Sequence, residues 1–481
     1  MRQENQSEQS PFNILGRTAP ILILRGFVIG GLQYFAKTAI VAQAGESTLD
    51  AYGVYGGIEN IAFILGFRGF RIISAHAAQL HAEDPIEMGV LYRRGVMFAG
   101  VLMIPSGLLC MSAPAIFEWT RQTPFAQQSS RLYFLCLFPG ILCDSAYRTL
   151  ARIHIGRSQP LSALIGDMVE CTVDVLLTWL LINKMGVAGA SAAYTISAAI
   201  TALGYNIHTY LHPDFQKYQL YNFTWDEIKK TFDSSEFKKM LFDGMYIAFK
   251  FGIVNITALL TTFLCSSIGP GALTGLKAAS AYGYFVSLPI GGFSEAASVL
   301  VGRLYKTNWN EAKKVGNFTI TASCAFASVC AGLLFTFTDP IARLFVSDDA
   351  AHANDFQAVK TFLRIQSIME IANSIANSGA SVLSGCLQTR YAFLLSVACI
   401  FVLNTLVSVL SYFKYSNDAT NLYAAQFLGL FCNAAGILWK WGQEEKPVEI
   451  NTTVAMHTMW QKPVPQVESP RHVAVTELLP I

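Results

Sequence analysis

The stretch from Arg17 to Gly45 most constrains the fold, because it is long and apolar and yet carries a lysine in its second half. About 20 consecutive apolar residues are enough to cross a bilayer as a helix. A charged side chain inside such a span is energetically costly, and it is expected to face a partner or a water-filled cavity rather than lipid. The sequence therefore predicts a membrane-spanning helix in which Lys37 has an interior partner.

The composition extends this prediction to the whole chain. Hydrophobic residues make up 53% of the 481 residues and charged residues only 14%, whereas soluble proteins have about 25% charged residues. A window of about 19 residues finds twelve apolar stretches, six in each half of the chain. We therefore expect an all-α polytopic membrane protein with twelve transmembrane helices, arranged as two six-helix lobes around a central cleft.

Polar segments divide the chain into its expected parts. These are a cytoplasmic N-terminal segment (1–16), an N-lobe with spans one to six (17–212), a cytoplasmic linker (213–238), a C-lobe with spans seven to twelve (239–443) and a disordered cytoplasmic tail (444–481). Lysine and arginine gather in the linker and after the second, fourth and eighth spans, and such charge marks cytoplasmic loops. Both termini are therefore predicted to be cytoplasmic. The first apolar run has no cleavage pattern typical of a removable signal peptide.

The two halves carry an internal repeat. Leu80 corresponds to Leu304 at an offset of 304 − 80 = 224 residues, and Ser158 falls opposite Thr389 at an offset of 389 − 158 = 231. Because each half has an even number of spans, both halves start on the same side of the membrane. The repeat is therefore predicted to be parallel, with its axis along the membrane normal, as in two-lobed transporters.

Three segments carry recognisable motifs. The most specific runs from Leu288 to Gly302 and reads LPIGGFSEAASVLVG; residues 186–193 read GVAGASAA, and Pro20 is followed by AKTAIVAQAG over residues 36–45. These segments resemble the multidrug and toxin extrusion (MATE) family, with its eighth-span pattern LPxGxxxAASxLVG, its sixth-span opening GVxGAAxA and its first-span pattern VDTxxVGxLG. The resemblance extends from about Pro20 to Trp441.

The resemblance implies a secondary active transporter. It would export small amphipathic organic compounds by alternating access, driven by a proton or sodium gradient, with no cofactor beyond the coupling ion. The expected partners are a small organic solute and the lipid bilayer, with no nucleic acid, and we expect a monomer in a bacterial inner membrane. In the family a first-span aspartate does much of the coupling, and Lys37 stands at the matching position here.

The acidic residues of the fifth span are the candidate partners of Lys37. Asp167, Glu170 and Asp174 are spaced i, i+3 and i+7 and share one face of a helix. Asp174 stands where the family usually has an asparagine, so we infer that Lys37 pairs with Asp174. The pair is either a static contact that holds the lobe together or an ion-linked pair that opens as a proton or substrate binds, with Glu170 as the titrating group.

A polar stripe marks the tenth span. Gln366, Glu370, Asn373 and Asn377 are spaced i, i+4, i+7 and i+11, which places them along one side of a helix. Such a stripe is expensive in lipid and is expected to face the cleft or the interior of the C-lobe. Two interpretations stay open: interhelical hydrogen bonds that hold the lobe together, or an ion-linked site that includes Glu370 and Asn377.

Lysines and aromatic residues are the candidates for the substrate cleft. Lys250 lies deep in the seventh span, whereas Lys277, early in the eighth, could instead reach the outer surface as an anchor. Tyr34, Tyr282 and Asn373 are further candidates to line the cleft. Several lysines directed at one cleft would favour an anionic or zwitterionic solute over an organic cation.

Other motifs carry no assigned chemistry. Arg68 and Arg71, near the end of the second span, are interpreted as interfacial anchors, and His76 and His81 lack a set of metal ligands around them. The ten cysteines form no CxxC pair, so no metal site is expected. The chain has no nucleotide-binding loop, GxSxG or HExxH motif, which argues against an enzyme or an ATP-driven pump.

Two functions remain, and they differ in the charge of the solute. The first is a MATE-like antiporter for amphipathic compounds, which the near-complete eighth-span motif favours. The alternative is an exporter or flippase for a specific anionic or zwitterionic solute, which Lys37, Lys250 and Lys277 favour. A channel is a weaker candidate, because it would not need two related lobes.

Overall fold

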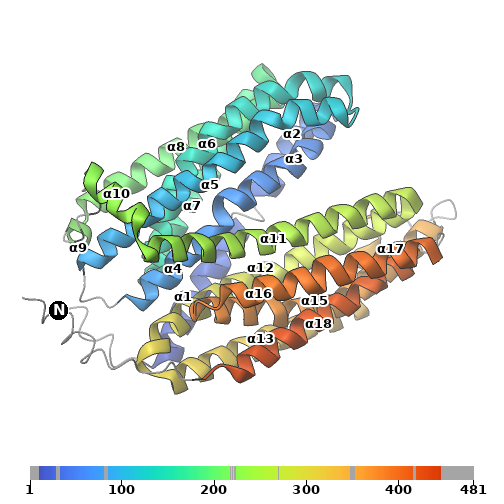
Figure 1. The fold of residues 1–481 in the computed structure, drawn as a ribbon. Coiled ribbons are helices and arrows are strands. Elements are labelled where there is room, and N and C mark those ends of the chain that lie inside the picture. The colour runs from blue at the N-terminus through green and yellow to red at the C-terminus, as the bar shows by residue number, and fades with distance from the viewer. Residues whose placement is uncertain are drawn as a thin grey trace, which may run out of the picture. The chain divides into compact units, whose positions relative to one another are not determined.

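The structure is a computed structural model. It describes residues 10–28, 33–80, 85–216, 218, 220, 224–268, 270–346, 353–414 and 419–445. Over these residues every regular element is a helix, and the helices of the two halves gather into two bundles (Figure 1). The prediction of an all-α fold is confirmed.

The first half supplies the helices of the first six spans. In chain order they are α1 (Pro11–Gly26), α2 (Tyr34–Gln43), α3 (Glu46–Phe67), the 3-10 turn η3 (Arg68–Phe70), α4 (Arg71–Gln79), α5 (Pro85–Trp119), α6 (Pro124–Gly156), α7 (Pro160–Met185) and α8 (Ala188–Leu211). The first span comprises α1 and α2, with residues 29–32 between them outside the described residues, and the second runs through η3 into α4. Proline is well suited to the first turn of a helix, where no backbone donor is needed, and α6 and α7 both begin with one.

The second half repeats this plan after two short connecting helices. The elements are α9 (Pro213–Gln216), α10 (Trp225–Asp233), α11 (Ser235–Ile268), α12 (Pro270–Thr307), α13 (Trp309–Thr336), α14 (Thr338–Ala342), α15 (Ala353–Gly385), α16 (Thr389–Ser396), the π-helical segment η4 (Val397–Leu403), α17 (Asn404–Lys414) and α18 (Ala419–Gln443). The eleventh span is continuous through α16, η4 and α17. Helix α1 begins inside the expected N-terminal segment and α11 begins inside the expected linker, whereas residues 1–9 and 446–481 lie outside the described residues.

Six helical segments of the described chain are long and apolar enough to cross a membrane by length and composition alone. They are Ala51–Gln79, Ile86–Trp119, Ser235–Thr262, Thr274–Thr307, Trp309–Thr336 and Thr389–Lys414. Several of the other long helices carry buried charges in their interior, such as Asp167 and Asp174 in α7 and Glu370 in α15. Such charges lower the mean hydropathy of a span, but they face the interior of the protein and do not contact lipid.

The internal repeat is visible in the backbone. Helix α5 starts at Pro85 and α13 at Trp309, which gives the predicted offset of 309 − 85 = 224. After α6 and α15, however, the left-handed residues are Ser158 (φ 57°) and Leu387 (φ 59°), an offset of 387 − 158 = 229. The predicted match of Ser158 with Thr389 is therefore wrong by two residues, because the turn geometry sets the register there.

Close backbone packing follows the same repeat. A Cβ atom on Gly156 would lie 2.7 Å from the carbonyl oxygen of Ser74, and a Cβ atom on Gly385 would lie 2.5 Å from that of Ser298. Ser74 and Ser298 are 224 residues apart, and Gly156 and Gly385 are 229 apart. Each half therefore uses a glycine at the end of a long helix for the same close approach.

The first span is shared between the two halves. Helix α1 packs most extensively against α12 of the second half, whereas α2 packs against α7 of the first half. A Cβ atom on Gly292 of α12 would lie 2.5 Å from the backbone nitrogen of Ile23, so the two helices approach very closely there. This arrangement places Arg25, on α1, near the boundary between the halves.

Candidate functional site

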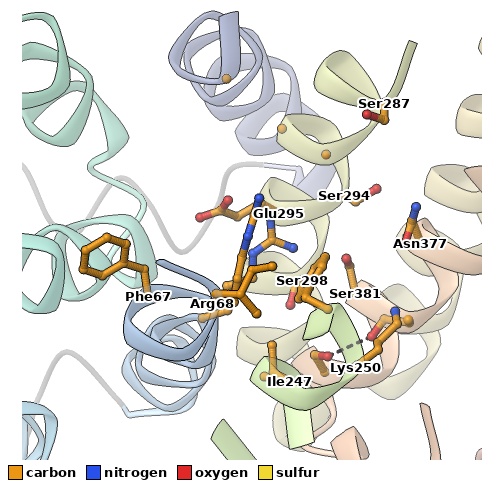
Figure 2. Close-up of a pocket in the computed structure, with 18 of the residues that line it drawn as sticks. Phe67, Arg68, Ile247, Lys250, Ser287, Ser294, Glu295, Ser298, Asn377 and Ser381 are labelled. Atoms are coloured by element: carbon orange, nitrogen blue, oxygen red, sulfur yellow. Dashed lines mark hydrogen bonds between the residues drawn. The ribbon is translucent and has the colours of Figure 1, made fainter. Parts of the chain in front are cut away.

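A cavity of about 690 Å³ lies between the two halves of the chain. Helices α1, α3, α4 and α6 of the first half and α11, α12, α15 and α16 of the second half all contribute to its wall (Figure 2). Its lining includes apolar and aromatic side chains such as Ile64, Phe67 and Tyr284, and polar ones such as Asn377 and Ser381. A cavity of this size and mixed lining is suited to a small organic molecule.

The charges on the cavity wall are strongly unequal. Six cationic residues line it, namely Arg25, Arg68, Arg71, Arg148, Arg152 and Lys250. Glu295 is the one acidic residue among the described residues that line it. Arg25 pairs with Asp167, and Arg148 pairs with Asp144 at 2.7 Å, within the first half. The remaining cations outnumber the carboxylate of Glu295.

Arg68, Arg71 and Lys250 gather around one aromatic ring. The guanidinium carbons of Arg68 and Arg71 lie 4.9 and 5.3 Å from the ring centre of Phe251, and Lys250 Nζ lies 5.8 Å from it. The described residues give none of the three an ion-pair partner, and Arg71 Nε is buried without a hydrogen bond. The prediction that Arg68 and Arg71 are interfacial anchors is therefore wrong, because both line this cavity.

Glu295 joins the two halves across the cavity wall. It lies on α12, and its Oε1 accepts a hydrogen bond from Arg152 Nη1 on α6; Arg25 Nη1 lies 3.9 Å from the same oxygen. Sequence reasoning missed Glu295, Arg25 and Arg152. One signal in the sequence could have identified Glu295: it is the second residue of the motif SEAAS, and a charged residue inside a span requires a partner.

Lys37 and Asp174 are in direct contact inside the first half. Lys37 Nζ lies 3.0 and 3.1 Å from the two carboxylate oxygens, and Gln33 donates a further hydrogen bond to Asp174 at 2.8 Å. Both partners are buried, with Asp174 fully enclosed. The predicted contact is present, while its part in ion coupling stays a prediction.

Two further carboxylates lie in the same interior. Glu170, on α7, is 3% exposed, and Glu59, on α3, accepts a hydrogen bond of 2.6 Å from the hydroxyl of Tyr133. In the part of the chain that the structure describes, neither has an ion-pair partner, because the neighbouring cations contact Asp144, Asp167 and Asp174. Glu59 has no motif around it and was not a candidate from the sequence.

A chain of polar side chains leads from Glu370 to the cavity. Gln366 and Asn373 donate hydrogen bonds to the two oxygens of Glu370 at 2.6 and 3.0 Å, and Asn377 donates to Asn373 at 2.8 Å. Glu370 is 3% exposed, whereas Asn377 lines the cavity. The polar stripe of the tenth span thus faces inward, with its carboxylate deep in the C-lobe.

The remaining candidates lie away from the cavity. Lys277 is exposed on α12, and Tyr282 packs against α13 and α15 with its hydroxyl buried. Neither they nor Asn373 belong to the described lining of the cavity. The side chain of Tyr34 falls outside what the structure describes.

The sequence of this chain is similar to that of known transport proteins. The MatE family model matches residues 247–410. A probable multidrug resistance protein NorM from Brucella suis is 23% identical over 319 residues, which cover 63% of this chain and 65% of that protein. A probable multidrug resistance protein NorM from Mesorhizobium japonicum is 20% identical over 366 residues, which cover 74% of this chain and 76% of that protein. The chain thus spans about two thirds of the Brucella relative's length in this alignment.

Solved structures resemble the fold over nearly its whole length. The crystal structure of the eukaryotic MATE transporter AtDTX14 superposes with a TM-score of 0.79 at 15% identity, covering 90% of this chain and 96% of that one. A MOP superfamily transporter from Pyrococcus furiosus superposes with a TM-score of 0.74 at 17% identity, covering 90% and 95%. The latter structure is described as having a binding pocket of reverse polarity that suggests a different function.

Proposed function

We propose that the chain is a secondary transporter of the MATE family, whose model matches residues 247–410, and that it exports a small organic anion through the cavity between its lobes. The family consists of transporters and not of enzymes, and the chain is an integral, multi-pass membrane protein. One observation carries the proposal: Arg68, Arg71 and Lys250 line the cavity without a carboxylate partner among the described residues. Buried charges of one sign call for a ligand of the other sign.

Charge complementarity supports an anion over a cation. An organic cation in this cavity would meet cations from α1, η3, α4, α6 and α11 and a single carboxylate that is already hydrogen-bonded. Like charges that face each other in a binding site disfavour the wrong ligand by several kcal/mol. An anion with an apolar body would instead pair with the guanidinium groups and pack against Phe67, Phe251 and Tyr284.

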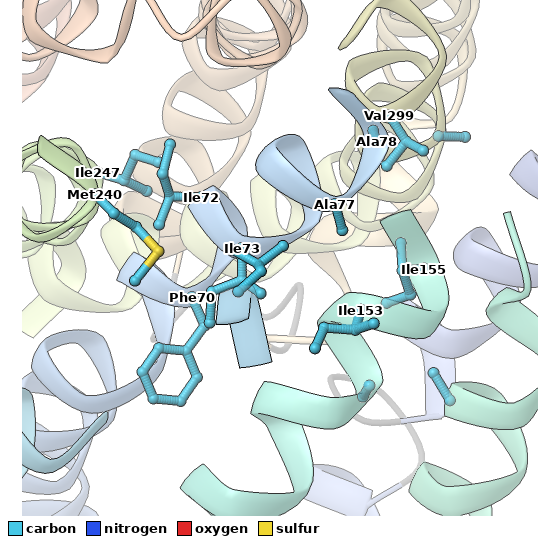
Figure 3. Close-up of a cluster of buried hydrophobic side chains, with 14 of the residues drawn as sticks. Phe70, Ile72, Ile73, Ala77, Ala78, Ile153, Ile155, Met240, Ile247 and Val299 are labelled. Carbon is cyan, nitrogen blue, oxygen red and sulfur yellow. The ribbon is translucent and has the colours of Figure 1, made fainter. Parts of the chain in front are cut away.

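The contacts between the lobes support alternating access. A buried hydrophobic cluster surrounds α4, with Phe70 and Ile73 from the second span, Met240 from α11 and Val299 from α12 (Figure 3). These contacts lie at the end of the lobes that the lysine and arginine distribution assigns to the cytoplasm. We infer that these contacts close the cavity on the cytoplasmic side in this state. The cavity opens to the opposite side of the membrane when the lobes separate at that opposite end. The bacterial relatives support a location in an inner membrane. The distribution of lysine and arginine supports cytoplasmic termini.

Glu370 is the proposed binding site for the coupling ion. It is a buried carboxylate that accepts hydrogen bonds from the side-chain amides of Gln366 and Asn373, so it can take up a proton or a sodium ion without breaking an ion pair. The hydrogen-bonded path through Asn373 to Asn377 at the cavity wall supports access of the ion to it. The Lys37–Asp174 pair would not need to open in this scheme, and we assign it a structural role in the N-lobe.

A second candidate function is the export of an amphipathic cation. The Brucella and Mesorhizobium relatives bear the name of multidrug resistance proteins. Glu59 and Glu170 also supply carboxylates without an ion-pair partner in the described N-lobe. Both carboxylates are outside the described lining of the cavity, which makes this function the weaker of the two.

Transport by purified protein in liposomes tests the proposal. We expect efflux of organic anions such as benzoate or citrate, driven by an imposed proton or sodium gradient, and no efflux of ethidium. Lys250→Gln should reduce anion transport at least tenfold, while the matched variant Lys277→Gln, which changes an exposed lysine outside the cavity, should leave it unchanged. Ethidium export that survives Lys250→Gln, together with no anion transport by the parent, would overturn the proposal in favour of cation export.

A further inference from the structure

We propose that Glu295 is a resident counterion of the cavity, which holds Arg152 while no solute is bound and is replaced there by the acidic group of the transported anion. This inference rests on the proposed export of an anion and goes beyond it by naming the group that the solute displaces. It assigns Arg152 as the primary contact for a carboxylate or phosphate on the solute. It also gives a function to a glutamate that occurs within the eighth-span motif.

The position of Glu295 is the first argument. Its carboxylate lies on the wall of the cavity, 12% exposed, and contacts Arg152 and Arg25, whose side chains are 11% and 6% exposed. An ion pair with only a structural role needs no contact with the cavity. Asp167, the other partner of Arg25, is enclosed in this way: it is not among the described lining residues, has no exposed side-chain surface and accepts a further hydrogen bond from Tyr147.

The balance of charge is the second argument. Asp167 and Asp144 neutralise Arg25 and Arg148 from inside the N-lobe, and neither carboxylate is among the residues that line the cavity. Glu295 is therefore the only lining carboxylate, within the described residues, that can share the cations with a solute. Guanidinium groups bind carboxylates and phosphates through paired hydrogen bonds. A solute with either group can thus make the same contact that Glu295 makes now.

The two sides of the contact belong to different lobes. Arg152 lies on α6 of the N-lobe and Glu295 on α12 of the C-lobe, so this ion pair is one of the bonds that hold the lobes together around the cavity. When the anion takes the place of Glu295 on Arg152, that bond between the lobes is broken. The exchange therefore connects binding of the solute to the movement that exposes the cavity to the other side.

Removing the charge of Glu295 distinguishes a counterion that the solute displaces from an ion pair with only a structural role. If Glu295 competes with the solute, Glu295→Gln should bind citrate and glucose 6-phosphate about tenfold more tightly than the parent, within the usual range of coupling between sites. Unidirectional export should fall, because the empty cavity then lacks the carboxylate that neutralises Arg152 while the empty transporter returns. Exchange of one anion for another should continue, because it does not need the empty transporter to return. Binding is measured by titration calorimetry on purified protein and transport in liposomes.

Two further variants complete the test. Glu311→Gln removes a carboxylate that pairs with Lys314 outside the cavity, and it should leave binding unchanged. Glu295→Asp keeps the charge on a shorter side chain, and it should give an intermediate gain in affinity, which provides a second result if the glutamine variant does not fold. Unchanged or weaker binding in Glu295→Gln or Glu295→Asp, with binding by the parent intact, overturns the counterion role alone. Failure of the parent to bind either anion overturns the proposed function and this inference with it.

Discussion

Gln79 and Arg303 occupy equivalent positions of the internal repeat, 224 residues apart, and each donates a hydrogen bond across the boundary between the lobes. Gln79 Nε2 donates to the carbonyl oxygen of Gly385 at 2.9 Å, and Arg303 Nη2 donates to that of Gly156 at 2.9 Å. The two acceptors are the last residues of α15 and α6, where helix carbonyls lack partners within the helix. Two equivalent bonds therefore close the same end of the protein.

Removing both bonds should open this end. We expect the double variant Gln79→Leu and Arg303→Leu to increase the reaction of a maleimide reagent with Cys386, which is buried beside Gly385. Labelling measured by mass spectrometry should rise severalfold at Cys386 and stay constant at Cys110, a buried cysteine in a separate cluster of the N-lobe. Equal labelling of Cys386 in the parent and the double variant would show that other contacts close the lobes.

Enlarging Gly385 should destabilise the protein. A Cβ atom there would lie 2.5 Å from the backbone oxygen of Ser298, so Gly385→Ala forces α12 and α15 apart. We expect a loss of about 1–3 kcal/mol, typical of overpacking, measured as a lower midpoint of thermal unfolding in detergent. Gly332→Ala is the matched control, because nothing lies within 4 Å of its added atom.

Lys37→Met should leave a buried carboxylate without its cation. Breaking one side of a buried ion pair costs about 3–5 kcal/mol, and Asp174 is fully enclosed. The double variant with Asp174→Asn should recover most of this loss, as followed by thermal unfolding. A double variant no more stable than Lys37→Met would contradict a structural role for the pair.

Glu370→Gln should uncouple transport from the ion gradient. Without a group that binds the ion, we expect at least a tenfold loss of gradient-driven export, while exchange of labelled for unlabelled solute continues. Glu118→Gln, at an exposed carboxylate, is the control. Full gradient-driven export by Glu370→Gln would place coupling elsewhere, and Glu59→Gln and Glu170→Gln would then be the variants to compare.

Phe251→Leu should weaken anion binding although Phe251 carries no charge. Three cations lie within 5.8 Å of its ring centre, and a cation over an aromatic face is stabilised by about 0.5–2 kcal/mol. Loss of the ring should let the cations move apart and lower anion affinity severalfold in calorimetry. Phe249→Leu, at an exposed ring on the same helix, should have no effect.

The partner of an interior charge could be predicted from the sequence where only one kind of residue could neutralise it. Lys37 required a carboxylate inside its lobe, and Asp174 lay on a span whose three acidic residues share one helical face. Arg68 and Arg71 were misinterpreted because their distance from a span end does not show which way they point. The helix continues through η3 into α4, and this continuation directs both arginines into the cavity.

Contacts between the lobes were harder to predict for a related reason. Arg152 and Glu295 are 143 residues apart, and nothing in either span identifies the other as its partner. The offset between the two repeats after α6 and α15 was hard to predict as well. Ser158 and Leu387 are equivalent in backbone conformation but have different side chains. Such relationships depend on how two bundles pack, and packing leaves little trace in the pattern of either span.

The three cations around Phe251 also decide how the membrane voltage acts on the protein. Each charge that crosses the membrane field gains or loses about 2.3 kcal/mol per 100 mV. A solute with as many negative charges leaves the loaded cavity nearly neutral, so its outward movement feels little of a voltage that is negative inside. The empty cavity keeps its positive charge, and the same voltage draws it inward. The cell's resting voltage would therefore drive the return of the empty transporter and so keep the cavity available to the next anion inside.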